Sequence, residues 1–498
     1  MSTPPTPDDT SLAALRARYG ERYRWLLLLA VMVGTMASIM SSTIVNVAIP
    51  DMSQHFTLGQ ERAQWVTSGF MAAMTVSMLT TPWLLARYGY RTTFSGCMWL
   101  LLIGGTAGGL ANHFPLVLAA RVAEGLAAGV VQPIPAIIIL RAFEPNEQGR
   151  ASGIFGMGVV LAPAIGPSVG GVLVDLFGWR SIFFMVVPFC IACLWMARKI
   201  IPTTAPGGGA ANPDGAALDW RGLLLAAAGT LCLLNGLVEL QGGTAATAVA
   251  LIALAAALLV VFIWLERRML KRRQHHQGVD PLMNLSLFRD RRFAMGSVVA
   301  FTYGVALFGS TYLLPVYMLM GLGLSASYVG TILLPAGLVL AITIAVVGRL
   351  ADRQPTHRLV SIGVLLLAAS FALMLTIDID HAPRIIPLLV LWAILGRIGL
   401  GFILPSLNIG AMRGIDRTHI PQGSSVINFL RMLGGAAGVS LCGIFLEWRV
   451  AAHGATLDTT STSPQRVAAF DETFLLLAVI CALALLAAMR LKPARDAQ

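Results

Sequence analysis

The chain alternates between long uninterrupted apolar runs and short segments that carry its charge. An α-helix needs about 20 apolar residues to cross a hydrocarbon core of about 30 Å, and only helices and closed barrels satisfy their backbone groups in lipid. Membrane barrels use alternating strands of about 10 residues, which these longer and continuously apolar runs exclude. We therefore predict an all-α integral membrane protein with fourteen spans, at approximately residues 25–49, 64–85, 93–111, 115–140, 150–173, 181–197, 222–240, 245–265, 293–320, 327–348, 359–377, 385–410, 421–446 and 472–489.

The composition agrees with this pattern. Of the 498 residues, 56% are hydrophobic and 12% are charged, whereas a soluble domain has about 45–50% apolar and about 25% charged residues. The 35 Lys and Arg residues against 24 Asp and Glu give a net charge of +11. Most of these basic residues fall in alternate loops, on the side of the N-terminus, as cytoplasmic loops do. The charge therefore indicates topology and not a nucleic-acid partner, and it predicts that both termini are cytoplasmic.

The sequence lacks the motifs of enzyme chemistry. It contains no phosphate-binding loop, no metal-ligand cluster and no nucleophile motif. We therefore expect that the protein does not hydrolyse ATP, is not an enzyme and binds no cofactor. The six cysteines all lie inside apolar runs, where no disulfide framework is expected. Cys190 and Cys193 have C-x-x-C spacing without a second pair or a histidine, and we interpret them as small hydrophobic residues.

Matching segments divide the chain into two halves. Residues 82–91 after the second span resemble residues 348–353 after the tenth, and Arg121 in the fourth span corresponds to Arg397 in the twelfth. Paired helical bundles with a central site are the architecture of secondary transporters. We expect a cytoplasmic tail (1–24), a six-helix bundle (25–200), a Gly- and Pro-rich flexible cytoplasmic linker (201–221), two inserted helices (222–266), a basic cytoplasmic loop that binds anionic lipid head groups (267–292), a second six-helix bundle (293–490) and a cytoplasmic tail (491–498).

Three segments carry a resemblance to a known family. They are TIVNVAIP at 43–50, Arg121-x-x-Glu124-Gly125, and PAIGP-x-x-GG at 163–171. They resemble the signatures of the major facilitator superfamily and, within it, the fourteen-span drug:proton antiporters of the EmrB/QacA type. The resemblance implies the major facilitator fold, with two six-helix bundles plus two inserted transmembrane helices.

The resemblance also implies a function. It indicates proton-coupled efflux of small amphipathic drugs or toxic compounds by alternating access, driven by the proton gradient across a bacterial inner (cytoplasmic) membrane. Fourteen-span pumps of Gram-negative bacteria often work with a periplasmic adaptor and an outer-membrane channel, which makes these candidate partners. The alternative is a dedicated exporter of a specific metabolite or anionic amphiphile with altered coupling.

Glu124 and Arg121 are the candidate proton-coupling residues. Burial disfavours the charged form of a carboxyl group and lets it carry a proton near neutral pH, whereas an arginine on the same helical face favours ionisation. The alternative is a permanently neutralised pair that anchors helix packing. Proteins of the resembled family usually have Gln at the position of Glu124 and Asp at that of Ser41, so Glu124 is a candidate to replace the missing acid. Glu239, the other carboxylate within a span, is expected at the membrane interface.

The first span carries a polar stripe at helical spacing, accompanied by methionines. Polar residues in lipid-embedded helices turn toward a cavity or a neighbouring helix, so the stripe either lines a substrate passage or bonds an adjacent helix. Methionine side chains suit promiscuous apolar ligands, although at this spacing they are also typical of ordinary packing. The candidate substrate-cavity residues are Thr35, Ser38, Ser42, Asn46, Met36, Met40 and, in the ninth span, Tyr312.

The fifth span resembles the antiporter signature that is found mainly in exporters. Proline and glycine bend a helix and allow close packing against a neighbour. A kink without consequence for the direction of transport is the alternative. The residues of this motif are Pro163, Gly166, Pro167, Gly170 and Gly171.

The loops after the second and tenth spans resemble the superfamily's gating-loop motif, in which an acid caps a helix and pairs across the bundle. Ala86 stands where the first half would have this acid, so we expect only the second of the two latches to be intact. The motif residues are Arg87, Gly89 and Arg91 in the first half and Gly348, Asp352 and Arg353 in the second.

Overall fold

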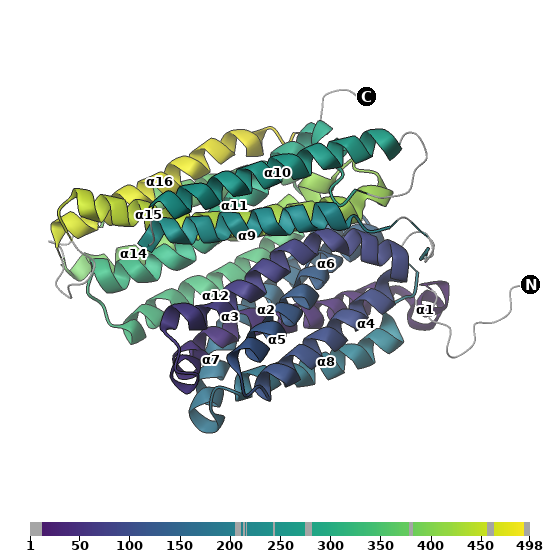
Figure 1. The fold of residues 1–498 in the computed structure, drawn as a ribbon. Helices are drawn as coiled ribbons and strands as arrows, with labels where there is room; N and C mark the ends of the chain where they lie inside the picture. The colour runs from purple at the N-terminus through teal and green to yellow at the C-terminus, as the bar shows by residue number, and fades with distance from the viewer. Residues whose placement is uncertain are drawn as a thin grey trace, which may run out of the picture. The chain divides into compact units, whose positions relative to one another are not determined.

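The computed structural model describes residues 12–204, 211–212, 215, 217–242, 245–273, 281–377, 382–455 and 463–492, which are mostly helical (Figure 1). The helices up to the linker are α1 (Leu12–Tyr19), α2 (Tyr23–His55), α3 (Gln60–Ser77), α4 (Thr81–Gly109), α5 (Phe114–Val131), α6 (Ile134–Ala142), α7 (Gln148–Phe177) and α8 (Ser181–Ile200). The later helices are α9 (Trp220–Gly242), α10 (Ala245–Arg273), α11 (Arg291–Val316), α12 (Ala326–Ala351), α13 (Thr356–Met374), α14 (Ala382–Met412), α15 (Ile420–Ala452) and α16 (Pro464–Met489).

Within these residues, 12 helical segments are long and apolar enough to cross a membrane. The prediction of an all-helical protein with many membrane spans is therefore confirmed, and the count of fourteen spans stays a prediction. One segment, Arg62–Gly109, has 48 residues and contains most of α3 and all of α4. Its path is interrupted at Gly89, whose φ of +79° is a conformation that glycine adopts without steric cost.

Proline and capping residues set several helix ends. The predicted span 115–140 is divided at Gln132 and Pro133 into α5 and α6, because proline lacks the N–H that would continue the helical hydrogen bonds. Asp290 caps α11, since its Oδ1 accepts the N–H groups of Arg292 at 2.7 Å and Phe293 at 3.3 Å. Such a cap satisfies donors that a helix leaves unpaired at its start.

The chain forms two compact units, and the beginning of α15 belongs to the first. Unit 1 comprises Met1–Ala227, Ile263–Asn284 and Asp416–Val426. In it, α2 packs against α7 and α8, and α5 packs against α3 and α4; Figure 1 shows these helices in purple and blue. The domain boundaries given in the sequence analysis stay a prediction.

Unit 2 comprises Ala228–Phe262, Leu285–Ile415 and Ile427–Gln498. Its α14 packs against α11, α12 and α13, and α16 packs against α11 and α13. A Cβ on Gly363 of α13 would lie 2.7 Å from Gly399 O of α14. Small residues thus let these two helix backbones approach closely, as is typical of membrane helix bundles.

All six cysteines are free thiols, five of them buried and Cys232 half-buried. Cys190 and Cys193 are completely enclosed on α8. No group of three or more His, Cys, Asp or Glu side chains in the described part of the chain could hold a metal ion. These cysteines fill space as small hydrophobic side chains.

Candidate functional site

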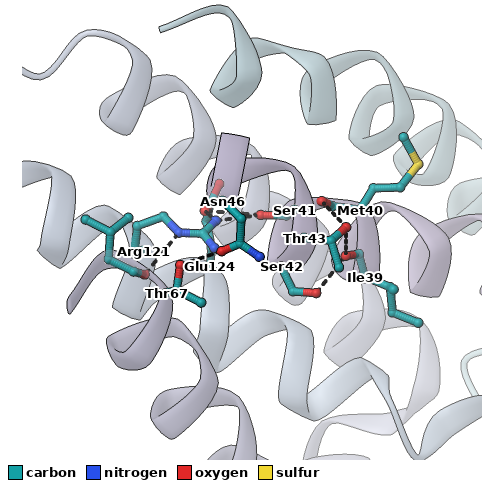
Figure 2. A network of polar contacts seen from close by, with 10 residues as sticks. Ile39, Met40, Ser41, Ser42, Thr43, Asn46, Thr67, Arg121 and Glu124 are labelled. Carbon is teal, nitrogen blue, oxygen red and sulfur yellow. Dashed lines mark hydrogen bonds and ion pairs between the residues drawn. The ribbon is translucent and has the colours of Figure 1, made fainter. Parts of the chain in front are cut away.

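Helices α2 and α5 bring Ser41, Arg121 and Glu124 together inside unit 1 (Figure 2). Arg121 Nη1 donates to Glu124 Oε2 at 2.5 Å and to Ser41 Oγ at 2.8 Å. Ser41 Oγ donates to the same Glu124 Oε2 at 3.3 Å. All three residues are 1% exposed. The ion pair is therefore enclosed, and the residue that stands in place of the missing acid touches both charges.

Helix α3 holds Arg121 from another side. Arg121 Nε donates to Val66 O at 3.4 Å, and the guanidinium carbon lies 4.2 Å from the centre of the Phe70 ring. A cation over an aromatic face is attracted by the negative face of the ring. Since neither contact involves Glu124, both can hold Arg121 whether that carboxyl group is charged or neutral.

Helix α4 provides the space that Glu124 occupies. A Cβ on Gly104 would lie 2.7 Å from Glu124 Cγ, and a Cβ on Gly105 would lie 3.3 Å from Glu124 Oε1. A larger residue at position 104 would therefore displace the carboxyl side chain. Sequence reasoning missed these two glycines, although the Gly pairs at 104–105 and 108–109 in the third span were an available signal.

Two atoms of the ion pair, Arg121 Nη2 and Glu124 Oε1, have no hydrogen-bond partner among the described residues. Buried polar atoms are rarely left unpaired, because the lost hydration is costly. A proton can be added at Glu124 Oε1 without breaking an existing hydrogen bond, whereas arginine does not release its proton in proteins. Protonation of Glu124 would leave the buried positive charge of Arg121 uncompensated. The net charge of the site would then change from zero to +1.

The polar stripe of the first span makes mostly local hydrogen bonds. Thr35 Oγ1 donates to Val31 O at 2.8 Å, and Ser38 Oγ donates to Gly34 O at 3.0 Å. Ser42 Oγ likewise bonds its own helix, at Ile39 O. Such bonds back to the preceding turn satisfy a hydroxyl group inside a helix.

Asn46 differs from the rest of the stripe. Its side chain is exposed, and its Oδ1 accepts the hydroxyl of Thr67 on α3 at 2.9 Å (Figure 2). Met40 is buried, and Met36 is half-buried with its sulfur 3.4 Å from a Cβ placed on Gly158 of α7. Both proposed roles, substrate passage and helix contact, thus stay open for the stripe, with Asn46 making the interhelical bond. Tyr312 is half-buried on α11 of unit 2.

The glycines of the antiporter motif lie on two faces of α7. A Cβ on Gly166 would lie 2.9 Å from Thr43 Oγ1, and a Cβ on Gly170 would lie 2.5 Å from Ile44 Cγ1. No described atom lies within 4 Å of a Cβ on Gly171. Gly166 and Gly170 therefore allow α2 and α7 to pack closely. Gly171 takes no part in this contact. Pro163 is half-buried in α7, and the side chain of Pro167 lies outside the described part of the chain.

Replacing Gly170 with Ala is expected to destabilise the protein, because the new methyl group meets the buried Ile44 side chain. Overpacking of this kind costs about 1–3 kcal/mol. The thermal unfolding midpoint of the purified protein in detergent measures it. The matched control is Gly171→Ala on the same helix, which should be neutral or slightly stabilising; equal loss in both variants would contradict this packing.

The gating-loop residues of the first half contact the linker. Asn212 N–H donates to Ala86 O at 2.9 Å, and Arg87 Nη1 donates to Gly215 O at 3.1 Å. A Cβ on Gly89 would lie 2.5 Å from Thr203 O. Two described residues of the linker, Asn212 and Gly215, are therefore hydrogen-bonded to α4, in a segment whose composition predicted flexibility. The sequence did not indicate this contact, because backbone groups make most of it.

The remaining gating-loop residues lie on α4 and around the end of α12. Arg91 is half-buried in α4. In the second half, Gly348 is buried near the end of α12, Asp352 follows the last residue of that helix, and Arg353 is exposed. Their gating role stays a prediction.

The second half differs from the first at the position that corresponds to Glu124. Arg397 of α14 corresponds to Arg121 by the internal repeat, and Leu400, three residues later, corresponds to Glu124. The carboxyl group beside the repeated arginine is thus a feature of the first half. Glu239 is half-buried on α9, and its expected position at the membrane interface stays a prediction.

Comparisons with known proteins agree with one another. A family model described as Major Facilitator Superfamily matches residues 31–439. The tetracenomycin C resistance and export protein of Streptomyces glaucescens is 30% identical over 455 residues, which cover 90% of this chain and 81% of the relative. The multidrug resistance protein B homolog of Mycobacterium tuberculosis (strain ATCC 25618 / H37Rv) is 28% identical over 453 residues, which cover 90% of this chain and 81% of the relative.

Two solved structures have the same fold. The human organic anion transporter MFSD10 (TETRAN) superposes with a TM-score of 0.62 at 15% identity, over 93% of this chain and 99% of that one. The proton:xylose symporter XylE superposes with a TM-score of 0.63 at 12% identity, over 94% and 95%. At these identities the similarity shows the fold alone.

Proposed function

The chain belongs to the major facilitator superfamily, and from this premise we propose that it exports small amphipathic drugs or toxic compounds in exchange for protons. It is a multi-pass membrane protein, and its family and fold are those of transporters rather than enzymes. Two similar proteins are named for multidrug resistance and for export of tetracenomycin C. These names support efflux as the direction of transport.

The enclosed contact of Ser41, Arg121 and Glu124 carries the coupling part of this proposal. Glu124 takes up a proton at Oε1, and this removes the negative charge that balances Arg121. An uncompensated buried charge is unstable, so proton binding favours a conformation in which Arg121 is better accommodated. Alternating access between two such conformations couples inward proton movement to outward substrate movement.

We propose fourteen spans, as in the EmrB/QacA-type branch. The segment Arg62–Gly109 has 48 residues, which as a helix would measure about 72 Å, more than twice a hydrocarbon core of about 30 Å. Its interruption at Gly89 supports two spans. Helix α7, with 30 residues, is not among the twelve candidate segments and contains the apolar run 150–173. These two additions bring the total to fourteen.

The proposed orientation has both termini in the cytoplasm and the protein in a bacterial inner membrane. The excess of Arg and Lys in alternate loops supports it. The two six-helix bundles are assigned to 25–200 and 293–490, with the inserted helices at 222–266. The basic segment 267–292 then faces anionic lipid head groups on the cytoplasmic side.

The proposed ligands are protons and small amphipathic molecules, and the proton gradient replaces any cofactor as energy source. A periplasmic adaptor and an outer-membrane channel are the proposed partners where two membranes must be crossed. Nucleic acid is not a proposed partner, because the basic residues are accounted for by topology.

Reconstitution in proteoliposomes tests this function. An imposed pH gradient should drive accumulation of a fluorescent amphipathic compound against its concentration gradient, and dissipating the gradient with an ionophore should abolish it. Accumulation that is insensitive to the ionophore would contradict proton coupling. Cationic, neutral and anionic compounds should be compared, because transport of one anionic compound or metabolite alone would support the alternative of a dedicated exporter.

A further inference from the structure

A second set of buried carboxyl groups lies in unit 1, where α9 begins and α10 ends. Glu266 is completely buried, and Asp219 is 5% exposed. Glu266 Oε1 lies 3.1 Å from the point that a Cβ on Gly222 would occupy, and Asp219 Oδ2 lies closer still to that point. The two carboxyl oxygens therefore converge beside a residue that has no side chain to separate them.

Asp219 uses its other oxygen to cap α9. Its Oδ1 accepts the N–H of Gly222 at 3.0 Å, and its backbone oxygen accepts the N–H of Leu223 at 3.0 Å. This is the arrangement of an N-cap residue, and the partial positive charge of a helix start favours the ionised carboxylate. Oδ2 has no hydrogen-bond partner within the described residues.

Glu266 has a complementary arrangement. Its Oε2 accepts the N–H of Met283 at 3.3 Å, whereas its Oε1 has no hydrogen-bond partner in the described part of the chain. Glu266 interacts with the backbone of Leu282 and Met283 through hydrogen bonds and with the carboxyl group of Asp219 through its charge. Each carboxyl group thus has one hydrogen-bonded oxygen and one oxygen without a partner among the described residues. The two unpartnered oxygens, Asp219 Oδ2 and Glu266 Oε1, both lie near the position of a Cβ on Gly222.

Among the described residues, the basic side chains that neighbour Asp219 and Glu266 in the sequence do not neutralise them. Arg267 and Arg268 follow Glu266 on α10 and are exposed, and the guanidinium of Arg268 lies over the Trp264 ring at 3.7 Å. Arg221, next to the cap of α9, is exposed as well. Because no described residue supplies a balancing cation, these two adjacent buried carboxyl groups cannot both stay ionised.

We propose that Asp219 and Glu266 share one proton, which is held on Glu266 Oε1 and donated to Asp219 Oδ2. A single proton satisfies both unpartnered oxygens, because a protonated carboxyl group donates one hydrogen bond and a carboxylate accepts it. The ionised partner is Asp219, at the positive end of α9. This proton-binding site is separate from Arg121 and Glu124 and does not depend on the proposed transport.

The shared proton ties Asp219 at the start of α9 to Glu266 at the end of α10, and the other oxygen of Glu266 accepts the backbone N–H of Met283. In an unfolded chain both carboxyl groups lose their protons well below neutral pH, since their ordinary pKa values are about 3.9 and about 4.3. The folded protein thus holds one more proton than the unfolded chain at neutral pH, so the free energy of unfolding decreases as the pH rises. Loss of the proton leaves two neighbouring negative charges and releases this tie.

Infrared spectroscopy of the purified full-length protein tests the site. The wild type at neutral pH should show the C=O stretching band of a protonated carboxylic acid, and part of this band should be absent from Glu266→Gln. In Asp219→Asn the band should move in frequency, because the acceptor of the hydrogen bond changes from a carboxylate to an amide. The thermal unfolding midpoint should fall with rising pH in the wild type and be less pH-dependent in Glu266→Gln.

Glu239→Gln is the matched control on α9, and its spectrum should equal that of the wild type. A spectrum of Glu266→Gln that keeps the whole acid band would overturn the proposal, and so would an unmoved band in Asp219→Asn. Disappearance of the band at constant pH on addition of NaCl or MgCl₂ would show a cation site in place of a proton site. Because two amide variants report on the same proton, failure of one to fold leaves the other as the test.

Discussion

Replacing Glu124 with Gln is expected to reduce proton-driven transport to the level of protein-free liposomes. The amide has nearly the same shape and can still accept a hydrogen bond from Arg121, but it cannot bind and release a proton near neutral pH. Downhill movement of substrate should persist, because the variant removes the coupling group and not the passage. The measurement is uptake into proteoliposomes with and without an imposed pH gradient.

A second substitution makes this test specific. Ser41 Oγ lies 2.8 Å from Arg121 Nη1, so an aspartate at position 41 would place a carboxylate beside the same guanidinium. The double variant Ser41→Asp/Glu124→Gln has the acid and the amide where the resembled antiporters usually have them, and it should recover proton dependence. A Glu124→Gln protein that still transports uphill with full proton dependence would rule out the coupling role.

Replacing Gly104 with Ala is expected to impair the same site without changing any titratable group. The added methyl group would lie 2.7 Å from Glu124 Cγ and 3.1 Å from Ala120 O, which is a backbone atom. Overpacking costs about 1–3 kcal/mol, and a loss of about 1.4 kcal/mol corresponds to tenfold in an equilibrium constant. We therefore expect at least a several-fold lower rate of proton-driven transport and a lower thermal midpoint.

The matched control for this variant is Gly96→Ala, also on α4. No described atom lies within 4 Å of a Cβ at that position, and alanine favours a helix over glycine by about 1 kcal/mol. Transport by Gly96→Ala should equal that of the wild type. If Gly104→Ala and Gly96→Ala lose transport to the same extent, the loss results from reduced flexibility of α4. The proposed displacement of the Glu124 carboxyl group would then be contradicted.

The positions of the helices could be predicted because they depend on local properties. The run 222–240 lies within α9, and the run 385–410 lies within α14, since length and continuous hydrophobicity are enough to specify a helix that crosses lipid. The break between α5 and α6 follows from Pro133, which the prediction included in one continuous span. The sequence signal for this break, a proline inside an apolar run, is local.

The candidate site could be predicted only in part. The pairing of Arg121 with Glu124 follows from their spacing of three residues on one helix face. The contact of Glu124 with Ser41 joins residues 83 positions apart, and it depends on how α2 packs against α5, which no local pattern specifies. Glu266 was missed for a different reason: the predicted span ended at residue 265, and this boundary excluded a carboxyl group that is completely buried.

The state of the cysteines has a practical consequence for spectroscopy. Five thiols are buried and Cys232 is half-buried, so a bulky maleimide dye added to the folded protein should react mainly at Cys232. A Cys232→Ser variant would then give a low labelling background without removal of the buried thiols that pack the helices. Pairs of new surface cysteines in this variant would allow distances to be followed during turnover by fluorescence or electron paramagnetic resonance.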